Sequence, residues 1–358
     1  MAKQKKVWKS VALEKSNRSA ADKIRDVLLT VAKGYHDAID DAGQLYDVLA
    51  DQFEKIEALK EDREVLEMLG WFMNCSAFFE IPESEEELEM AVEELFAAAV
   101  DKFVEKAKDF EDREYVMSLM HDLVVNSVGE EPRTELFLST HDFLSAEELE
   151  KVMQEVVSTV TSHDLENEGE IYAGLMDFAD GAGNPQQYEK FAYLADPEHS
   201  NKTHIDVANA YYVTDDLVNA NRVLAEVKDP TGSDEEEFLD LKVGILFKEE
   251  KQKEALDLAE KLYEKFPKEY HLMSLCQVVS PKRKEELLDA HEKFRLTVYV
   301  SPDYVNMLAT LGEFDRLEKY LDTYKNEIHL MDGQVREELA NRLESLNRKD
   351  LAKKFRRI

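Results

Sequence analysis

The stretch from Phe238 to Pro267 constrains the fold of this chain more than any other. It reads as two amphipathic helices with a charged break between them, and the second carries a stripe of apolar residues at helical spacing: Ala255, Leu258, Ala259, Leu262 and Phe266. Ser233 and Glu236 have the spacing of a capping box for the first helix, and Pro267 ends the second. One hairpin cannot bury two apolar stripes by itself. The stretch therefore predicts an array of stacked hairpins.

The same two-helix pattern recurs from about residue 170 to the end of the chain. The breaks within successive pairs are predicted near Gly183, Thr214, Glu250, Ser280, Gly312 and Asn347. Gaps of 30 to 36 residues between these breaks are typical of helical-repeat proteins. The only run that resembles a strand, Arg295–Val300, would have no partner, so we interpret it as a helix end or linker. The sequence predicts an all-α fold.

Three regions are expected along the chain. Residues 1–18 are polar and basic and predict a flexible arm, residues 19–165 predict an N-terminal helical region, and residues 166–358 predict the repeat array. Within the second region, Ser145 and Glu148 form a further capping box. Residues 129–145 give no clear signal and fit either a short helix or an extended segment.

The hairpin at Phe238–Pro267 resembles a tetratricopeptide repeat. Ala255 occupies the position of that motif's small residue on the second helix, and Pro267 falls twelve residues later at its closing proline. The pair before it has a small residue at Ala220 and an aromatic at Tyr211. The resemblance covers about residues 170–358 and implies a helical-hairpin solenoid, right-handed, with a concave surface that binds peptides or proteins. Proteins of this class usually have no catalytic activity of their own.

Charge is distributed unevenly. The chain carries −33 in total, but residues 1–25 carry +6 and residues 347–358 carry +5, which leaves −44 for residues 26–346. This acidic body predicts a protein partner with a basic surface or a basic peptide, and no direct binding of nucleic acid by the body. Two cysteines, no signal peptide and no apolar run long enough to span a membrane predict a cytoplasmic protein that binds no membrane.

Candidate chemistry is sparse. Four of the nine histidines precede an aspartate, in the pairs His36-Asp37, His121-Asp122, His141-Asp142 and His163-Asp164. Such pairs occur in metal-dependent phosphohydrolases, but these four have no consistent spacing, and 78 acidic residues make such neighbours common by chance. Phosphate-binding glycine motifs are absent, and Asp177–Asn184 lacks the ligand pattern of a calcium loop. We expect no catalytic residue, no cofactor and no metal.

The function expected from these observations is a non-catalytic scaffold or adaptor that binds a protein partner through an acidic helical-repeat surface. Four tyrosines of the array are candidate partner-binding residues: Tyr211, Tyr212, Tyr320 and Tyr324. They fit either a peptide groove or packing between helices. The alternative is an acidic mimic of nucleic acid that inhibits a nucleic-acid-binding protein. A metal-dependent hydrolase built on the His-Asp pairs is the third hypothesis.

Overall fold

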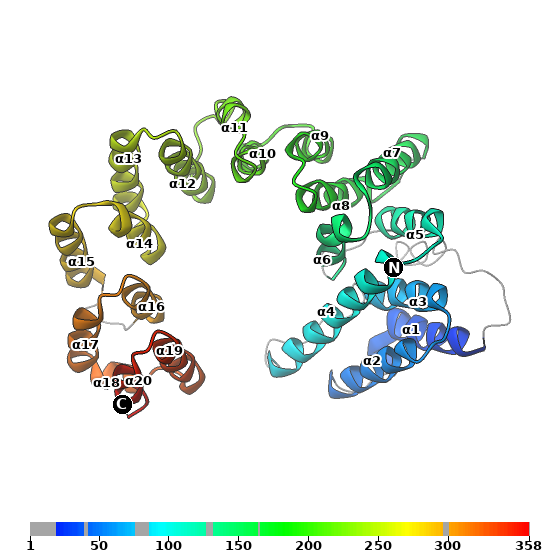
Figure 1. Cartoon of the computed structure of the whole chain (residues 1–358), viewed down its shortest axis with the longest axis horizontal. Helices are drawn as coiled ribbons and strands as arrows, with labels where there is room; N and C mark the ends of the chain where they lie inside the picture. The colour runs from blue at the N-terminus through cyan, green and yellow to red at the C-terminus, as the bar shows by residue number, and fades with distance from the viewer. Residues whose placement is uncertain are drawn as a thin grey trace. The chain divides into compact units, whose positions relative to one another are not determined.

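The structure is a computed structural model, and it describes residues 19–38, 42–75, 86–126, 132–163, 165–295 and 301–357. Within these ranges there are helices, turns and loops, but no β-strand, which confirms the all-α prediction (Figure 1). The arm at residues 1–18 and most of the run at Arg295–Val300 lie outside the described residues. None of the described helices is both long and apolar enough to cross a membrane.

The chain divides into two units, Met1–Glu226 and Val227–Ile358. The division that we predicted near residue 165 lies inside the first unit. The helices described in the first unit are α1 (Ser19–Ala38), α2 (Ala42–Glu57), α3 (Asp62–Asn74), α4 (Glu86–Lys108), α5 (Arg113–Val125), α6 (Arg133–Leu138), the 3-10 helix η5 (Ser139–Asp142), α7 (Ala146–Ser162), α8 (Glu168–Gly181), α9 (Pro185–Ala195), α10 (Asn201–Val213) and α11 (Leu217–Leu224).

Helix α3 forms the centre of the first unit's core. All of its residues from Val65 to Asn74 are buried, and α1, α2, α4 and α5 pack around it. The core continues through the aromatic side chains of α4, α6 and α8, where Phe137 and Phe178 meet edge to face. The segment at residues 129–145, for which the pattern was ambiguous, holds the short helix α6 and η5 in its described part.

A buried cation sits within this core. The guanidinium of Arg133 is fully buried and donates from Nη1 to Asn74 Oδ1 at 3.0 Å and to the carbonyl oxygen of Asn126 at 3.1 Å. Burial lowers the pKa of Arg133 to about 10. These bonds join α6 to α3 and to the end of α5, so they fix the position of a helix only six residues long.

The second unit consists of α12 (Ser233–Lys248), α13 (Gln252–Lys265), α14 (Glu269–Val278), α15 (Pro281–Arg295), α16 (Pro302–Thr310), α17 (Phe314–Thr323), α18 (Lys325–His329), α19 (Gly333–Ser345) and α20 (Lys349–Arg357) in its described part. Six packed pairs span the two units, in agreement with the predicted hairpins: α8 with α9, α10 with α11, α12 with α13, α14 with α15, α16 with α17, and α19 with α20.

Five of these pairs share one turn geometry in the described chain. In each turn one residue has a φ between 61° and 72°: Gly183, Asp215, Glu250, Gly312 and Asn347. Its N–H donates to the carbonyl three residues back, and the next N–H donates to the carbonyl five residues back. This is the Schellman motif that closes a helix through a left-handed residue. The positions coincide with four predicted breaks and lie next to Thr214 at the fifth, whereas the α14–α15 turn has no such residue.

Candidate functional site

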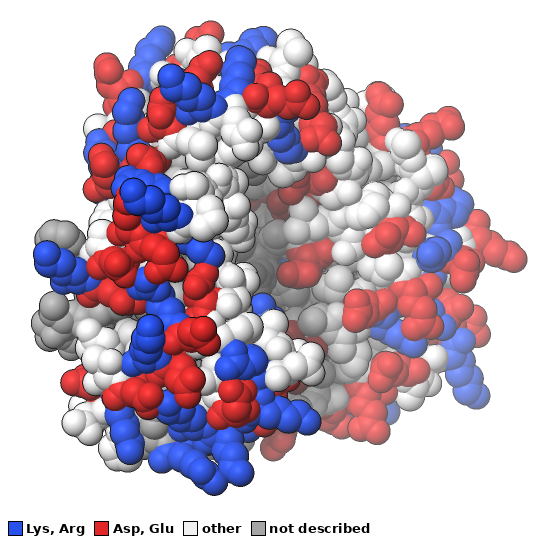
Figure 2. All heavy atoms as spheres, turned by 60° about the vertical axis from the view of Figure 1, so that its left-hand side comes forward, with Lys and Arg blue, Asp and Glu red and all other residues white. Residues whose placement is uncertain are grey.

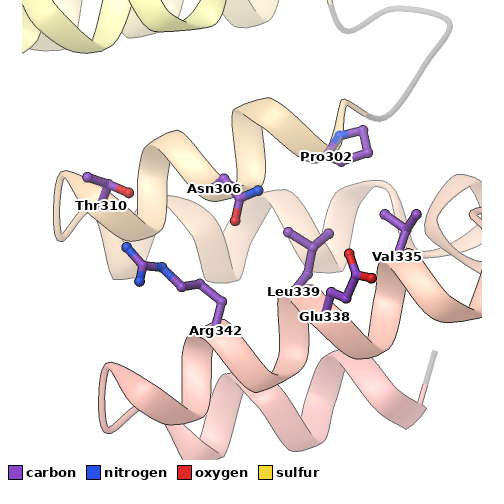
Figure 3. A pocket seen from close by; sticks show the side chains of 7 residues that line it. All are labelled: Pro302, Asn306, Thr310, Val335, Glu338, Leu339 and Arg342. Carbon is purple, nitrogen blue, oxygen red and sulfur yellow. The ribbon is translucent and has the colours of Figure 1, made fainter. Parts of the chain in front are cut away.

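Two neighbouring hollows lie along the first helices of three successive pairs. One, of about 510 Å³, lies between α14 and α16 and is lined by Lys268, Glu269, Tyr270, Met273, Asp303, Asn306, Met307 and Thr310. The other, of about 450 Å³, lies between α16 and α19 and is lined by Pro302, Asn306, Thr310, Val335, Glu338, Leu339 and Arg342 (Figure 3). Asn306 and Thr310 line both hollows. The two hollows, which share these residues of α16, are together called the groove below.

Helix α16 forms the floor of the groove because of where it begins. The Ser301 hydroxyl accepts a hydrogen bond from the N–H of Tyr304 at 3.3 Å, and Pro302 follows as the first helical residue, as the sequence predicts. Pro302, Asn306 and Thr310 then recur every four residues, which places them on one face of the helix. The opposite face, which carries Tyr304, is buried.

Helix α19 forms one wall. Val335, Glu338, Leu339 and Arg342 lie at positions i, i+3, i+4 and i+7, and so share a face. Asn306 points from α16 toward α19, while Leu339 and Arg342 point from α19 toward α16 (Figure 3). Within the described residues, neither the Asn306 amide nor the Arg342 guanidinium has a hydrogen-bond or ion-pair partner. Both are therefore available to a ligand.

The other wall is held from outside the groove by Glu236 of α12. This carboxylate accepts hydrogen bonds from Lys268 Nζ at 2.8 Å, from the hydroxyl of Tyr270, and from His271 Nε2 at 2.9 Å. The Tyr270 ring also packs on the His271 ring, with 4.0 Å between centroids. Tyr270 is 48% exposed, so its hydroxyl is anchored while its ring faces the groove.

This use of Glu236 corrects the prediction of a capping box. The N-cap of α12 is Gly232, with a φ of 62°, and no side chain caps this helix. The carboxylate of Glu236 is occupied by α14 instead. Burial acts to raise its pKa, but the hydrogen bonds from Lys268, Tyr270 and His271 outweigh burial and lower the pKa to about 2. Glu236 is therefore a carboxylate at neutral pH.

A second polar network supports α16 from behind. Arg316 of α17 donates to three carboxylates of α15, namely Glu285 at 2.5 Å, Asp289 at 2.7 Å and Glu292 at 3.0 Å. The hydroxyl of Tyr304 on α16 donates to Glu292 at 2.5 Å. These bonds raise the pKa of Arg316 although its burial acts in the opposite direction. The network ties three helices together and orients the buried face of α16.

The four predicted tyrosines do not line the groove. Tyr211 is only 2% exposed, and its hydroxyl donates to Glu189 Oε2 at 2.6 Å; burial raises the pKa of Tyr211 to about 12. Its neighbour Tyr212 is half-buried, and both lie in the first unit. Tyr320 is buried edge-on against Tyr304, with 5.4 Å between ring centroids, and half-buried Tyr324 packs on Tyr320 at 4.8 Å. The packing role that the sequence left open describes Tyr211 and Tyr320.

The aromatic residue of the groove is Tyr270, which sequence reasoning missed. Its signal is weak, because a single exposed tyrosine at the start of a helix has no distinctive pattern. The spacing of Pro302, Asn306 and Thr310 at i, i+4 and i+8 on α16 could have placed them on one face, and in a hairpin array the first helices of successive pairs lie next to one another.

The His-Asp pairs that are described have structural partners. His121 lies 3.2 Å from Asp122 and its Nε2 is 2.9 Å from the hydroxyl of Thr159, while the His141 and Asp142 side chains are 3.7 Å apart. Asp164 and the side chains of His36 and Asp37 lie outside the described residues. Elsewhere in the chain, the described residues contain no cluster of three or more His, Cys, Asp or Glu that could hold a metal.

The two cysteines lie in different units. Cys75 and Cys276 are both buried, and neither forms a disulfide. Burial raises the pKa of both thiols, to about 11 for Cys276. They are therefore protonated core residues and not reactive thiolates.

Comparison with known proteins adds no family to this description. No protein-family model matches the chain, and no curated protein matches it in sequence.

Proposed function

We propose that this chain is a non-catalytic scaffold or adaptor, built on a tetratricopeptide-like helical-hairpin array, and that the groove on α14, α16 and α19 binds an extended segment of a protein partner. The observation that carries the proposal is that two neighbouring hollows share Asn306 and Thr310. Hollows that follow the first helices of three successive pairs suit an extended polypeptide better than a compact metabolite.

The repeated turn supports the array. Five pairs turn through a residue of the same left-handed conformation at the same place, a regularity that supports repeated units. The small residues of the tetratricopeptide resemblance, Ala220 and Ala255, are both fully buried where their helices pack. Both features are what hairpins of this class require.

The chemistry of the groove fits a peptide. Met273 is partly exposed and offers apolar contact, and methionine adapts to side chains of different shape. The Asn306 side chain has both a donor and an acceptor and can pair with a peptide backbone. Tyr270 is oriented before a ligand arrives, which reduces the entropy lost on binding.

Charge directs the choice of partner. Residues 26–346 carry a net charge of −44, which favours a partner with a basic surface or a basic peptide. This charge accelerates the approach of such a partner at low ionic strength. On the face shown in Figure 2, however, Lys and Arg are interspersed among Asp and Glu. A cluster of carboxylates at phosphate-like spacing would favour a mimic of nucleic acid, and the mixed charges of this face support the scaffold instead. A cytosolic location is part of the proposal, because two buried, unpaired cysteines need no oxidising compartment.

A peptide-display selection on the purified protein tests the proposal. Selected peptides should bind the wild type and the control variant Thr323→Arg, which places the same residue on an exposed position of α17 outside the groove. They should lose at least about tenfold in affinity for the double variant Asn306→Arg, Thr310→Arg, because two long cationic side chains would fill both hollows.

Two results would contradict the proposal. Equal binding of the selected peptides to the groove variant and to the control would remove the groove from the interaction. Displacement of a bound partner by duplex DNA or single-stranded RNA at physiological salt would favour the acidic mimic instead, because a mimic and nucleic acid compete for one site on the partner.

A further inference from the structure

The last helices of the second unit form a basic hollow that shares no residue with the groove. It has a volume of about 220 Å³ and is lined by Asp322, Lys325, Asp350, Lys353, Lys354 and Arg357, from α17, α18 and α20. Four cations and two carboxylates give the lining a charge of +2. This local excess is unusual in a chain that carries −33 overall.

Both carboxylates of the hollow are already engaged. Lys354 Nζ lies 2.6 Å from Asp322, and Arg348 Nη2 lies 2.8 Å from Asp350. The other three cations, Lys325, Lys353 and Arg357, are exposed and form no ion pair within the described residues. Three unneutralised cations that face one small hollow present a ready site for an anion.

The three cations come from two helix ends. Lys353 and Arg357 lie near the C-terminal end of α20, where cations are favourable next to the free carbonyl groups. Lys325 follows the end of α17 at Thr323, where a cation is favourable for the same reason. The fold brings both helix ends to one hollow, so their cations can act on one ligand.

We infer that this hollow binds a phosphate monoester group. A dianion matches several cations better than a single carboxylate does, and the arginine fork can contact two phosphate oxygens at once. A compact group is favoured over a nucleic-acid chain because charges interact strongly only within about 8 Å at physiological ionic strength. A single phosphate is matched by the three cations of the hollow alone, and it is therefore the ligand that we propose.

Titration of the full-length chain tests this inference with three probes: inorganic phosphate, a phosphoserine peptide of otherwise uncharged residues, and the same peptide without phosphate. The double variant Lys325→Gln, Lys353→Gln should weaken binding of the phosphorylated probe by about tenfold or more. The control Lys253→Gln, Lys282→Gln removes the same charge from exposed positions on α13 and α15 and should bind like the wild type. Helical circular dichroism spectra of both variants should match the wild type, because all four positions are exposed.

The probes distinguish the source of the phosphate. Binding of inorganic phosphate comparable to that of the phosphopeptide supports a free phosphorylated small molecule, and preference for the phosphopeptide over both other probes supports a phosphorylated partner segment. The inference would be overturned if neither phosphate probe bound, or if the control variant lost as much affinity as the test variant. It would also be overturned if a single-stranded RNA, titrated in the same way, bound more tightly than the phosphate probes and lost affinity in the test variant. The groove variant Asn306→Arg, Thr310→Arg should retain phosphate binding, so failure of the proposed groove would leave this result unaffected.

Discussion

Gly181 lies so close to Leu138 that a Cβ atom at position 181 would be 1.9 Å from the carbonyl oxygen of Leu138. The obstacle is backbone, at the junction of α6 and η5, and it cannot rotate away as a side chain could. The contact brings the end of α8 against the segment that Arg133 anchors in the core.

Gly181→Ala should therefore destabilise the protein by about 3 kcal/mol or more, because either α8 or the α6–η5 segment must move. Gly169→Ala in the same helix is the matched control, since a Cβ there meets nothing within 4 Å. That change should be neutral or stabilising by up to about 1 kcal/mol. Urea unfolding measures both, and equal midpoints for the two variants would show that α8 is not held at this distance.

The shared turn predicts substitutions with opposite signs. Glu250 and Gly312 have equivalent positive φ values, but only glycine adopts this conformation without steric cost. Glu250→Gly should raise the free energy of unfolding by up to about 1 kcal/mol, and Gly312→Ala should lower it by about 1 kcal/mol. Thermal unfolding of the two variants checks the turn, and a change of the same sign in both would contradict the equivalence of these positions.

Arg316 should be essential to the second unit's stability. Arg316→Gln leaves Glu285, Asp289 and Glu292 facing one another without their shared cation, and we expect a loss of about 2 kcal/mol or more at pH 7. Part of the loss should disappear at high salt, which screens the repulsion between the carboxylates. Arg342→Gln, which removes an exposed arginine with no ion pair in the described chain, should change stability by less than about 0.5 kcal/mol. A deficit in Arg316→Gln that is the same at low and at high salt would argue against repulsion as its cause.

Acid should weaken the groove wall through Glu236. Its pKa is lowered from an ordinary 4.5 to about 2 in the folded chain, so its contribution to stability is fully present above about pH 4.5 and is lost as the pH falls toward 2. Glu236→Gln should be less stable than the wild type at pH 7, and its stability should fall less steeply over this range. Glu264→Gln, at an exposed position of α13, should keep the slope of the wild type. Urea midpoints measured from pH 7 to pH 3 provide the test, and identical slopes for wild type and Glu236→Gln would refute it.

Much of the helical architecture could be predicted because its signals are local. Apolar periodicity located the pairs, and turn positions such as Gly183 and Gly312 were visible because glycine and a polarity break coincide there. The Ser145 cap was found for the same reason, and the structure shows both of its hydrogen bonds. Each of these features depends on residues within a few positions of one another.

The groove could not be predicted because its determinants are distant in sequence. Glu236 has the spacing of a capping residue, yet its carboxylate bonds to residues 32 to 35 positions later. The tyrosines chosen from sequence were large and conspicuous, and two of them, Tyr211 and Tyr320, were drawn into the core, while the exposed ring belongs to Tyr270. Which face of a helix stays open depends on how the neighbouring pair packs, and that information is not local.

Glu236 does not line the groove, but it holds two residues that do, Lys268 and Tyr270. A residue buried behind the wall thus determines what shape an incoming peptide meets. Substitutions that change which partner is bound are therefore not confined to positions that contact the partner. Two proteins descended from this one that share every groove residue would bind different segments if they differed at residue 236.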